Sequence, residues 1–269
     1  MRATLAPSIP KARWLSAFEP SWAEDSPNCG FMLVDDGRLV GALGAIYSNR
    51  IVRGRPIRFC NLSSWTVLPA YRSKGLLLLN TVLKQAGYVF TNLSPAPETM
   101  PIYQRLRFRQ IDTTRWIVAN VPGGGGQAVV NAQELEARLP ESARSAYLAH
   151  RHLPGVYHLG LEGPDGLAYV VFIRGRYRRL PCAVVVHVAD RARLADNMAT
   201  LRNHALIHHG FAVTAIEHRH LSIRPSFALT SHASMPALYR SSEVDDEDID
   251  GLYSEVVSLT PLGPRSSWG

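Results

Sequence analysis

Cysteine, lysine and long apolar runs are scarce in this sequence. Its three cysteines, Cys29, Cys60 and Cys182, are widely separated and lack the spacing of a metal site. We interpret them as reduced thiols and expect neither a disulfide framework nor a bound metal. The longest aliphatic run covers residues 76–79, far below the roughly 20 residues that cross a bilayer. Residues 1–11 carry two prolines and no apolar run typical of a signal peptide, which favours a cytoplasmic protein without a membrane span.

The scarcity of lysine also bears on the positive charge. The formal net charge is +7, yet the chain has only Lys11, Lys74 and Lys84, so arginine supplies the excess. Arginines gather at residues 50–58 and 174–179, where they alternate with apolar residues as on solvated strand faces. This pattern favours a generally arginine-rich surface over a nucleic-acid site, with a polyanionic or phosphorylated small substrate as the alternative. The acidic run 243–250 is expected to form a solvated turn or helix start, or to neutralise one arginine group.

Length and glycine distribution predict two domains. A chain of 269 residues that is 46% hydrophobic is long enough for two small cores. Four consecutive glycines at 123–126 are the clearest linker, because neither a helix nor a strand holds such a run favourably. The expected domains are therefore residues 1–122 and 127–269.

The most informative segment covers residues 62–87, where an apolar strand stops at Pro69 and an amphipathic helix follows a short turn. The strand contains β-favouring residues, and the helix shows apolar residues at helical spacing before Gly87. The first amides of that helix, near residues 74–77, place the positive end of its dipole at the turn. A phosphate is the usual occupant of such a turn, where Gly75 permits close approach and Arg72 and Lys74 add charge.

The sequence Arg72-Ser73-Lys74-Gly75-Leu76-Leu77 resembles the Arg/Gln-x-x-Gly-x-Gly/Ala loop of the GCN5-related N-acetyltransferase (GNAT) superfamily. That loop holds the pyrophosphate of acetyl-coenzyme A on backbone amides. The resemblance implies acetyl-CoA or another acyl-CoA as cosubstrate, bound by Val67, Arg72, Ser73, Lys74, Gly75, Leu76 and Leu77. Leu77 departs from the family pattern, which has a small residue there, and narrows the room for the pyrophosphate.

Flanking elements extend the resemblance over residues 31–118. An Asp36-Gly37 hairpin joins strands at 30–34 and 38–47, as between the family's second and third strands. A strand at 88–93 and a short helix near 98–106 follow, and Tyr103 and Phe108 match a terminal Tyr-x-x-x-Gly-Phe element. Arg107 replaces the family's glycine and is a second departure. The implied fold is α/β, with a mostly antiparallel twisted sheet flanked by helices.

The second half repeats the order of the first, at an offset of about 120 to 135 residues. A helical segment at 132–150 precedes a turn at 163–166, a strand at 183–188, a helix ending at Gly210, and a strand at 211–217; residues 236–239 match 101–103. This order predicts two GNAT-like domains in tandem. Asp190 stands near the start of the second helix, where a carboxylate caps the helix and repels phosphate. We therefore expect one coenzyme site, in the first half, and a degenerate second half that completes the substrate cleft or is structural.

Roles at the reacting centre follow partly from the resemblance. Tyr103 matches the family's general acid at the departing thiolate, or is a core tyrosine. A strand amide of Thr66, Val67 or Leu68 polarises the thioester carbonyl. Glu98 is the best-placed carboxylate for a general base, or a surface residue, and Asn61, Ser63 and Ser64 are possible water-mediated relays.

Other residues have weaker assignments. Trp65 and Ser64 are expected to line the acceptor pocket, with packing as the alternative for Trp65. His204 and His208 share a helical face, but no acidic residue completes a known metal spacing, so a surface or half-buried role is expected.

These features predict an acyl-CoA-dependent acyltransferase of the N-acetyltransferase type. It moves an acetyl or other short acyl group to an amine or hydroxyl of a small molecule, with a sugar or polysaccharide precursor as one candidate. An amine of pKa 10.4 costs about 4.6 kcal/mol to deprotonate at pH 7, against about 1.4 for one of pKa 8. The lack of an obvious base therefore favours a low-pKa amine or a hydroxyl. Two alternatives stay open: an inactive GNAT-fold binding protein, and a transferase that uses an aminoacyl-tRNA or carrier-protein thioester.

Overall fold

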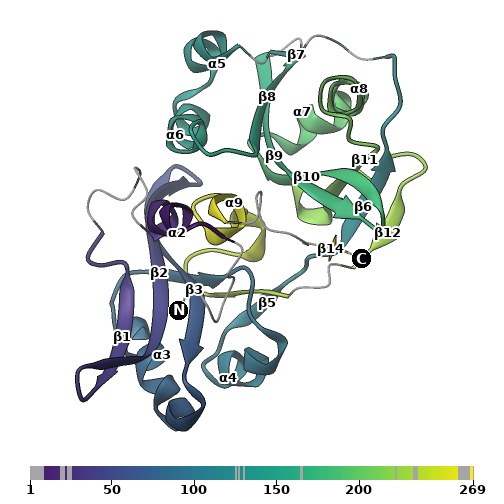
Figure 1. Cartoon of the computed structure of the whole chain (residues 1–269). Coiled ribbons are helices and arrows are strands. Elements are labelled where there is room, and N and C mark those ends of the chain that lie inside the picture. The colour runs from purple at the N-terminus through teal and green to yellow at the C-terminus, as the bar shows by residue number, and fades with distance from the viewer. Residues whose placement is uncertain are drawn as a thin grey trace. The chain divides into compact units, whose positions relative to one another are not determined.

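The computed structural model describes residues 9–18, 22, 26–124, 126, 128–129, 131–163, 166–221, 223–232, 236–259 and 267–268. They form two compact units. Unit 1 holds the described residues up to Ile111, with 236–249 and 253–259; unit 2 holds those from Asp112 to 232, with 250–252 and 267–268. Each unit has a mixed sheet flanked by helices, as Figure 1 shows.

Unit 1 is built on a six-stranded sheet in the order β1-β2-β3-β4-β13-β5. Its strands are β1 (Gly30–Asp35), β2 (Arg38–Val52), β3 (Arg55–Val67), β4 (Val89–Asn92), β5 (Arg109–Ile111) and β13 (Ala237–Arg240). Its helices are α2 (Lys11–Phe18), η1 (Pro69–Lys74), α3 (Gly75–Leu83), η2 (Pro97–Thr99), α4 (Met100–Arg105), η4 (Asp246–Asp248) and α9 (Glu255–Ser258). β3 and β4 are parallel, and the remaining pairs are antiparallel.

The predicted Asp36-Gly37 hairpin is confirmed, as is the predicted order of a strand, a helix and a further strand after it. Asp36 and Gly37 adopt φ of 46° and 74°, which is the left-handed pair that a tight hairpin turn requires. α3 buries Leu78, Leu79 and Val82 against one face of the sheet, together with Tyr103 and Phe108. The opposite face packs a second cluster around Phe59 and Val89. The sheet thus has an apolar core on each side.

Unit 2 contains an eight-stranded sheet, with seven strands in the order β12-β6-β11-β10-β9-β8-β7 and β14 beside β9. Its strands are β6 (Arg115–Ala119), β7 (Ala128–Val129), β8 (Val156–Gly163), β9 (Gly166–Tyr177), β10 (Leu180–Val188), β11 (Val213–Glu217), β12 (Leu229–Ser231) and β14 (Ser267–Trp268). Its helices are α5 (Ala132–Arg138), α6 (Glu141–His150), α7 (Arg191–Asp196), α8 (Met198–His209) and η3 (His218–His220).

The predicted internal duplication appears in the connectivity. In unit 1 a long antiparallel pair, β2 and β3, is followed by α3 and the parallel strand β4. In unit 2 the antiparallel pair β9 and β10 is followed by α7, α8 and the parallel strand β11. A register shift interrupts the β2–β3 ladder near Ser64 and the β9–β10 ladder near His187. The chain therefore consists of tandem α/β units with the same central topology.

Two strands lie in the sheet of the other half, which corrects the predicted assignment. β6, expected at the end of the first domain, pairs with β11 and β12 in unit 2. β13, expected to repeat the short helix near Tyr103, is a strand between β4 and β5 in unit 1. Periodicity identifies such short strands but not their partners, because pairing depends on non-local hydrogen bonds.

The first boundary between the units in the sequence therefore lies between Ile111 and Asp112, and not at the glycine run. Part of that run is bound to α8. The Gly123 amide donates to Asn203 Oδ1 at 2.9 Å, and the Gly126 amide donates to Thr200 Oγ1 at 2.7 Å. These contacts attach the described glycines to unit 2, whereas a free linker would make none. The predicted boundaries 1–122 and 127–269 therefore differ from the compact units.

Several local expectations are modified by the structure. The helical segment 132–150 is two helices, since α5 ends at Arg138 and Pro140 precedes α6. The acidic run supplies partners for one arginine group: Arg53 binds Asp248 at 2.9 Å and Asp245 at 3.4 Å. No helix in the described part of the chain has the length and apolar character to cross a membrane.

Candidate functional site

The candidate site lies in unit 1, where β3 and β4 diverge. β4 pairs with β3 only from Phe59 to Asn61, although β3 continues to Val67. Beyond Asn61, no described strand lies beside the outer edge of β3. We call the stretch of β3 after Asn61 the opening, because its backbone groups on that edge have no partner strand among the described residues.

The exposed backbone edge includes the Val67 amide. The Leu68 amide donates to the Val40 carbonyl at 2.8 Å, so it faces β2. Because successive residues of an antiparallel strand face opposite edges, the Val67 amide faces the opening. Of the three amides predicted to polarise a carbonyl, Val67 therefore has the suitable direction, and Leu68 is already bonded. The ladder irregularity at Ser64, whose φ is 59°, precedes this stretch.

A buried carboxyl lies on one side of the opening. Glu255 accepts hydrogen bonds from Asn61 Nδ2 and Ser94 Oγ, and Asn61 Oδ1 accepts one from Thr91 Oγ1 at 2.9 Å. Burial raises the pKa of Glu255, and the hydrogen bonds from Ser94 and Asn61 offset only part of that effect. A carboxyl with a raised pKa is a stronger base than an exposed glutamate.

Tyr103 lies on the other side of the sheet and is fully buried. Its hydroxyl accepts a hydrogen bond from Asn92 Nδ2 at 2.8 Å. Its ring is edge-on to Trp65 and Phe108, with centroid distances of 6.0 and 5.0 Å. Burial raises the pKa of Tyr103, with the Glu255 charge adding to the effect, so the hydroxyl keeps its proton and can donate a hydrogen bond.

The turn predicted to hold the pyrophosphate is more helical than expected. η1 begins at Pro69 and runs directly into α3, and the Gly75 amide donates to the Arg72 carbonyl. Lys74 Nζ lies 3.8 Å from Asp35 Oδ1, and the Tyr71 hydroxyl donates to Asp35 Oδ2 at 2.7 Å. Asp35 therefore partly neutralises the charge that Lys74 was predicted to offer. Arg72, Ser73, Leu76 and Leu77 are all exposed around this turn.

Gly75 is required for packing rather than for an unusual backbone angle. Its φ is −58°, which is ordinary for a helix. A Cβ at this position would lie 3.3 Å from Val67 Cγ2 and 3.5 Å from Trp65 Cζ2. The side of Gly75 toward the strand is thus filled by Trp65 and Val67. The Trp65 indole N–H is buried and has no hydrogen-bond partner among the described residues.

The structure brings only some of the predicted residues together. Trp65, Val67 and Gly75 are in contact, and Ser63 Oγ lies 3.2 Å from Ser64 Oγ. Glu98 is exposed on η2, a position from which it makes no hydrogen bond or ion pair to the described residues of the opening. The backbone turn at Arg107 survives the loss of glycine, because Arg107 itself adopts φ of 63°.

Glu255 was missed by the sequence reasoning. It is separated from Asn61 by 194 residues, and a single glutamate in a short apolar segment carries no recognisable motif. Its Ser254 neighbour caps α9 by accepting a hydrogen bond from the Val256 amide, which was a readable signal for a helix start. That signal predicts the element but gives no indication of where it packs.

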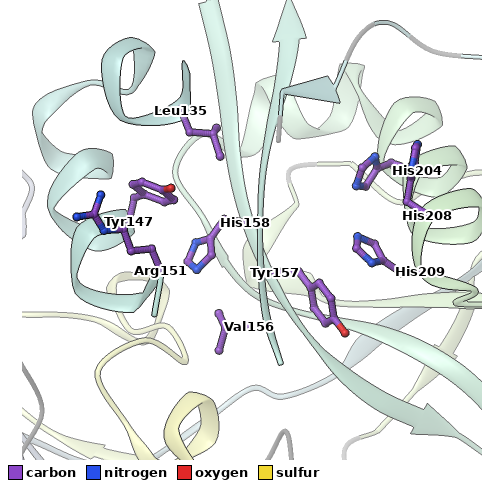
Figure 2. A pocket seen from close by; sticks show the side chains of 9 residues that line it. All are labelled: Leu135, Tyr147, Arg151, Val156, Tyr157, His158, His204, His208 and His209. Carbon is purple, nitrogen blue, oxygen red and sulfur yellow. The ribbon is translucent and has the colours of Figure 1, made fainter. Parts of the chain in front are cut away.

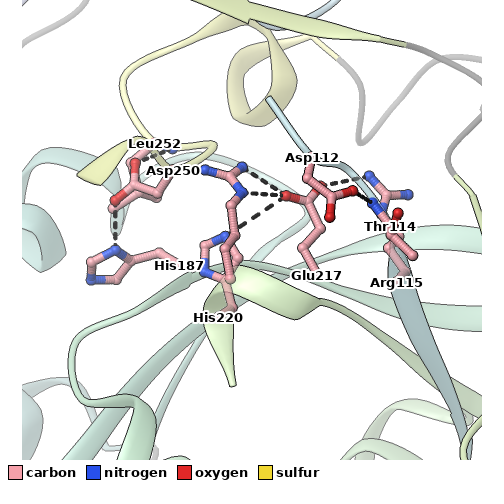
Figure 3. A network of polar contacts seen from close by, with 9 residues as sticks. Asp112, Thr114, Arg115, His187, Glu217, His220, Asp250 and Leu252 are labelled. Carbon is pink, nitrogen blue, oxygen red and sulfur yellow. Dashed lines mark hydrogen bonds and ion pairs between the residues drawn. The ribbon is translucent and has the colours of Figure 1, made fainter. Parts of the chain in front are cut away.

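The equivalent position of unit 2 has different chemistry. Asp190 caps α7, as predicted: its Oδ1 accepts from the Arg193 amide at 3.0 Å, and its Oδ2 lies 3.2 Å from Arg193 Nε. His187 lies at the ladder irregularity of β10, with its Nδ1 2.7 Å from Asp250 Oδ2. Figure 3 shows this pair beside a second network. A carboxylate thus occupies the helix start that phosphate would need.

The second network stabilises the end of β11. Glu217 Oε1 lies 3.0 Å from Arg115 Nη2, and its Oε2 lies 2.7 Å from Arg219 Nη2. Burial acts to raise the pKa of Glu217, but the charges of Arg219 and Arg115 outweigh it and lower the pKa to about 2. Burial, with Arg219, lowers the pKa of His220 to about 3, so this imidazole is neutral (Figure 3). We interpret this network as structural.

Unit 2 also has a cavity of about 350 Å³ (Figure 2). It is lined by Leu135, Tyr147, Arg151, Val156, Tyr157, His158, His204, His208 and His209. The rings of His204 and His208 are stacked with an interplanar angle of 27°, and their centroids are 4.4 Å apart. His204 is buried, and burial with the neighbouring His208 lowers its pKa to about 4. No group of three or more metal-binding side chains is arranged for a metal in the described part of the chain.

Comparisons with known proteins give structural likeness only. No protein-family model and no curated protein matches the sequence. The chain is similar to a GCN5-related N-acetyltransferase from Anabaena variabilis ATCC 29413, with a TM-score of 0.49, 13% identity, and coverage of 78% of this chain and 61% of that one. It is similar to Eis1 from Mycobacterium abscessus, with a TM-score of 0.47, 15% identity, and coverage of 85% of this chain and 69% of that one.

A third similar structure is a conserved protein of unknown function from Enterococcus faecalis V583, described as a probable N-acyltransferase. Its TM-score is 0.48 at 13% identity, with coverage of 79% of this chain and 61% of that chain. The chain spans about 61% of the length of the first of these proteins.

Proposed function

We propose that this chain is an acyltransferase that moves an acetyl or other short acyl group from a coenzyme A thioester to an amine or hydroxyl of a small molecule. The observation that supports this most is the divergence of β3 and β4 between a buried carboxyl and a buried tyrosine hydroxyl. The proposal also assigns the coenzyme to the exposed side of the turn at residues 72–77.

The open edge of β3 suits an extended molecule with amide groups. Coenzyme A carries amides along its pantetheine arm, and these pair with a strand edge as a peptide does. With the arm on this edge, the Val67 amide donates to the thioester oxygen and stabilises the negative charge that develops there.

Glu255 is the proposed general base. The acceptor nitrogen or oxygen gives its proton to a Glu255 oxygen as it attacks the thioester carbon. Asn61 and Ser94 hold the carboxyl in place, and the raised pKa increases its affinity for that proton. Glu98, the base expected from the sequence, is exposed and lacks positioning partners of this kind among the described residues.

Tyr103 is proposed to stabilise the leaving group. When the carbon–sulfur bond breaks, the electron pair stays on sulfur, and the Tyr103 hydroxyl donates a hydrogen bond to the thiolate. Its raised pKa makes full proton transfer from Tyr103 to sulfur unfavourable, so the thiolate takes its proton from solvent, and Glu255 releases the proton of the acceptor to solvent. Asn92 fixes the orientation of the hydroxyl.

The first test is binding. A ligand at 100 times its dissociation constant adds about 2.7 kcal/mol of stability, so acetyl-CoA is expected to raise the melting temperature. Gly75→Glu places a charged side chain against Trp65 and the turn, and is expected to abolish the shift. If no coenzyme A ester shifts the melting temperature of the wild type, the proposed cosubstrate is wrong.

The second test is turnover, followed by release of the free thiol with a panel of amines, amino sugars and hydroxyl acceptors. Glu255→Gln is expected to lower kcat by about 10²–10⁴-fold, the range for loss of a general base. Glu98→Gln is the matched control and is expected to retain activity. A melting shift without turnover of any acceptor identifies a binding protein instead. Salt-sensitive retention on RNA without a coenzyme A shift favours an aminoacyl-tRNA donor.

A further inference from the structure

The cavity of unit 2 is not used by the proposed function. Its volume of about 350 Å³ lies within the range of pockets that bind small molecules. Its walls come from α5, the end of α6, the start of β8, and α8, all of which belong to unit 2. The basic side chains that line it are Arg151, His158, His204, His208 and His209, and no described aspartate or glutamate lines it. The cavity therefore presents positive or neutral groups to a ligand.

Three of these side chains lie together on α8 (Figure 2). The centroid of the His204 ring is 4.4 Å from that of His208 and 5.2 Å from that of His209. His204 is only 6% exposed, and none of the three imidazoles makes a hydrogen bond or ion pair to a described residue. An imidazole buried to this extent normally has a hydrogen-bond partner, and the cavity is the place from which one can come.

The other basic side chains of the cavity already have partners. Arg151 Nη1 lies 2.5 Å from Glu136 Oε2, so the two charges are matched. His158 Nδ1 lies 2.7 Å from the Tyr169 hydroxyl. The imidazoles of α8 are therefore the lining groups best able to bind a ligand.

The surroundings of these imidazoles favour an anion. The centroids of the Tyr157 and His209 rings are 4.5 Å apart, and Arg174 Nη2 donates to the Tyr157 hydroxyl at 3.5 Å. Arg174 of β9 thus adds a positive charge that acts on His209, and Tyr157 adds an aromatic surface. A metal ion is not favoured, because no three metal-binding side chains are arranged for one in the described part of the chain.

The charge state of the imidazoles responds to an anion. Burial, followed by the charges of His208 and His209, lowers the pKa of His204 to about 4. Burial, followed by the charges of His208 and Arg174, lowers the pKa of His209. Other elements contribute basic, phenolic and ion-paired groups around the cavity: Tyr147, Tyr157, His158, Arg174, and Arg151 with Glu136. An anion beside the α8 rings adds an unmatched negative charge and favours their protonated form.

We propose that this cavity binds a small organic anion, with its carboxylate or phosphate at the imidazoles of His204, His208 and His209 and its apolar part against Tyr157 and Val156. The site lies in unit 2 and does not depend on the acyl transfer proposed for unit 1. Binding is accompanied by proton uptake, because the bound anion stabilises the imidazolium form. The affinity therefore rises as pH falls, by up to about tenfold per pH unit for each proton taken up.

The test is a calorimetric titration of the full chain with sodium benzoate, up to about 20 mM and at about pH 5.5 and 7.5. Benzoic acid, an ordinary carboxylic acid, is ionised at both values, so a change in affinity comes from the protein. Benzoate is expected to bind about tenfold more tightly at the lower pH. Benzamide, a neutral molecule of the same shape, is expected to bind about tenfold more weakly than benzoate there. Phenyl phosphate, titrated in parallel, distinguishes a phosphate ester from a carboxylate as the preferred anion.

Glutamine variants test the residues. His204→Gln and His208→Gln keep a hydrogen-bonding side chain that takes up no proton, and each is expected to weaken benzoate binding about tenfold at the lower pH and to reduce its pH dependence. His208 is exposed, so His208→Gln tests the site without altering the core. His232→Gln changes an exposed histidine of unit 2 that does not line the cavity, and this matched control is expected to bind as the wild type does.

Three results overturn the proposal. The first is that neither benzoate nor phenyl phosphate binds the wild type at the lower pH. The second is that benzamide binds as tightly as benzoate, which shows that the cavity does not recognise charge. The third is a benzoate affinity that both glutamine variants leave unchanged, which places the bound anion elsewhere on the chain.

Discussion

Replacement of Glu255 by glutamine tests the electrostatics of the candidate site independently of its catalytic role. Glutamine reproduces the protonated form of the side chain, since its Oε1 accepts from Asn61 Nδ2 and its Nε2 donates to Ser94 Oγ. At low pH, where Glu255 is protonated, the variant and the wild type are expected to be equally stable. At higher pH only the wild type must ionise a buried carboxyl.

The direction of this difference in unfolding free energy follows from the raised pKa of Glu255, which burial causes. Its contribution to wild-type stability is full below the unfolded pKa of about 4.3 and is lost as pH rises through the folded pKa. A folded pKa that lies one pH unit above the unfolded pKa corresponds to about 1.36 kcal/mol of unfolding free energy. Glu255→Gln is therefore expected to become more stable than the wild type as pH rises, in proportion to the difference between the folded and unfolded pKa of Glu255.

Urea unfolding at pH 4, 6 and 8 measures this difference, with Glu255→Ala as a control. Alanine leaves the buried Asn61 amide and Ser94 hydroxyl without an acceptor, which costs about 1–3 kcal/mol at every pH. A difference between Glu255→Gln and wild type that does not vary with pH would refute the assigned burial. If the pH dependence is found but Glu255→Gln retains full turnover, the electrostatics hold and the base assignment fails.

Other substitutions test the rest of the fold. Glu217→Gln removes the carboxylate that binds Arg115 and Arg219, and is expected to cost about 3–5 kcal/mol in urea unfolding at pH 7; a loss below about 1 kcal/mol contradicts it. Because the pKa of Glu217 is lowered to about 2, the wild-type contribution is present above about pH 4.3 and is lost as pH falls through 2. A Cβ at Gly37 meets no atom within 4 Å, so Gly37→Ala costs only about 1–2 kcal/mol for its φ of 74°. A Cβ at Gly30 clashes with the backbone oxygen of Leu43, so Gly30→Ala is expected to lower the melting temperature several times more. Arg107→Gly relieves a φ of 63° and is expected to raise the melting temperature; a decrease argues against that turn.

The local elements of unit 1 were predictable because their signals are local. Asp36-Gly37 specifies a hairpin through left-handed backbone angles, and Pro69 marks the end of β3. Asp190 is recognisable as a helix cap from its position alone, and its bond to the Arg193 amide confirms it. In each case a few neighbouring residues determine the conformation, so the sequence contains the whole cause.

Parts of the candidate site were not predictable, because they depend on contacts between residues of different elements. Gly75 was expected to leave room for a ligand, yet the structure places Trp65 against it. Lys74 was expected to offer charge, yet Asp35 lies 3.8 Å away. Both contacts join residues from different elements, and no periodicity indicates such distances.

The amino-acid sequence by itself determined the repeated order of strands and helices, the strand, turn and helix at residues 62–83, and the resemblance that these carry. Tertiary structure alone decided that β6 and β13 lie in the sheets opposite to their expected halves, and that Glu255 is buried beside Asn61. The physical reason is the range of the interactions involved. Caps, turns and amphipathic spacing act over a few residues, whereas strand pairing and the burial of a carboxyl depend on which distant segments fill the same space.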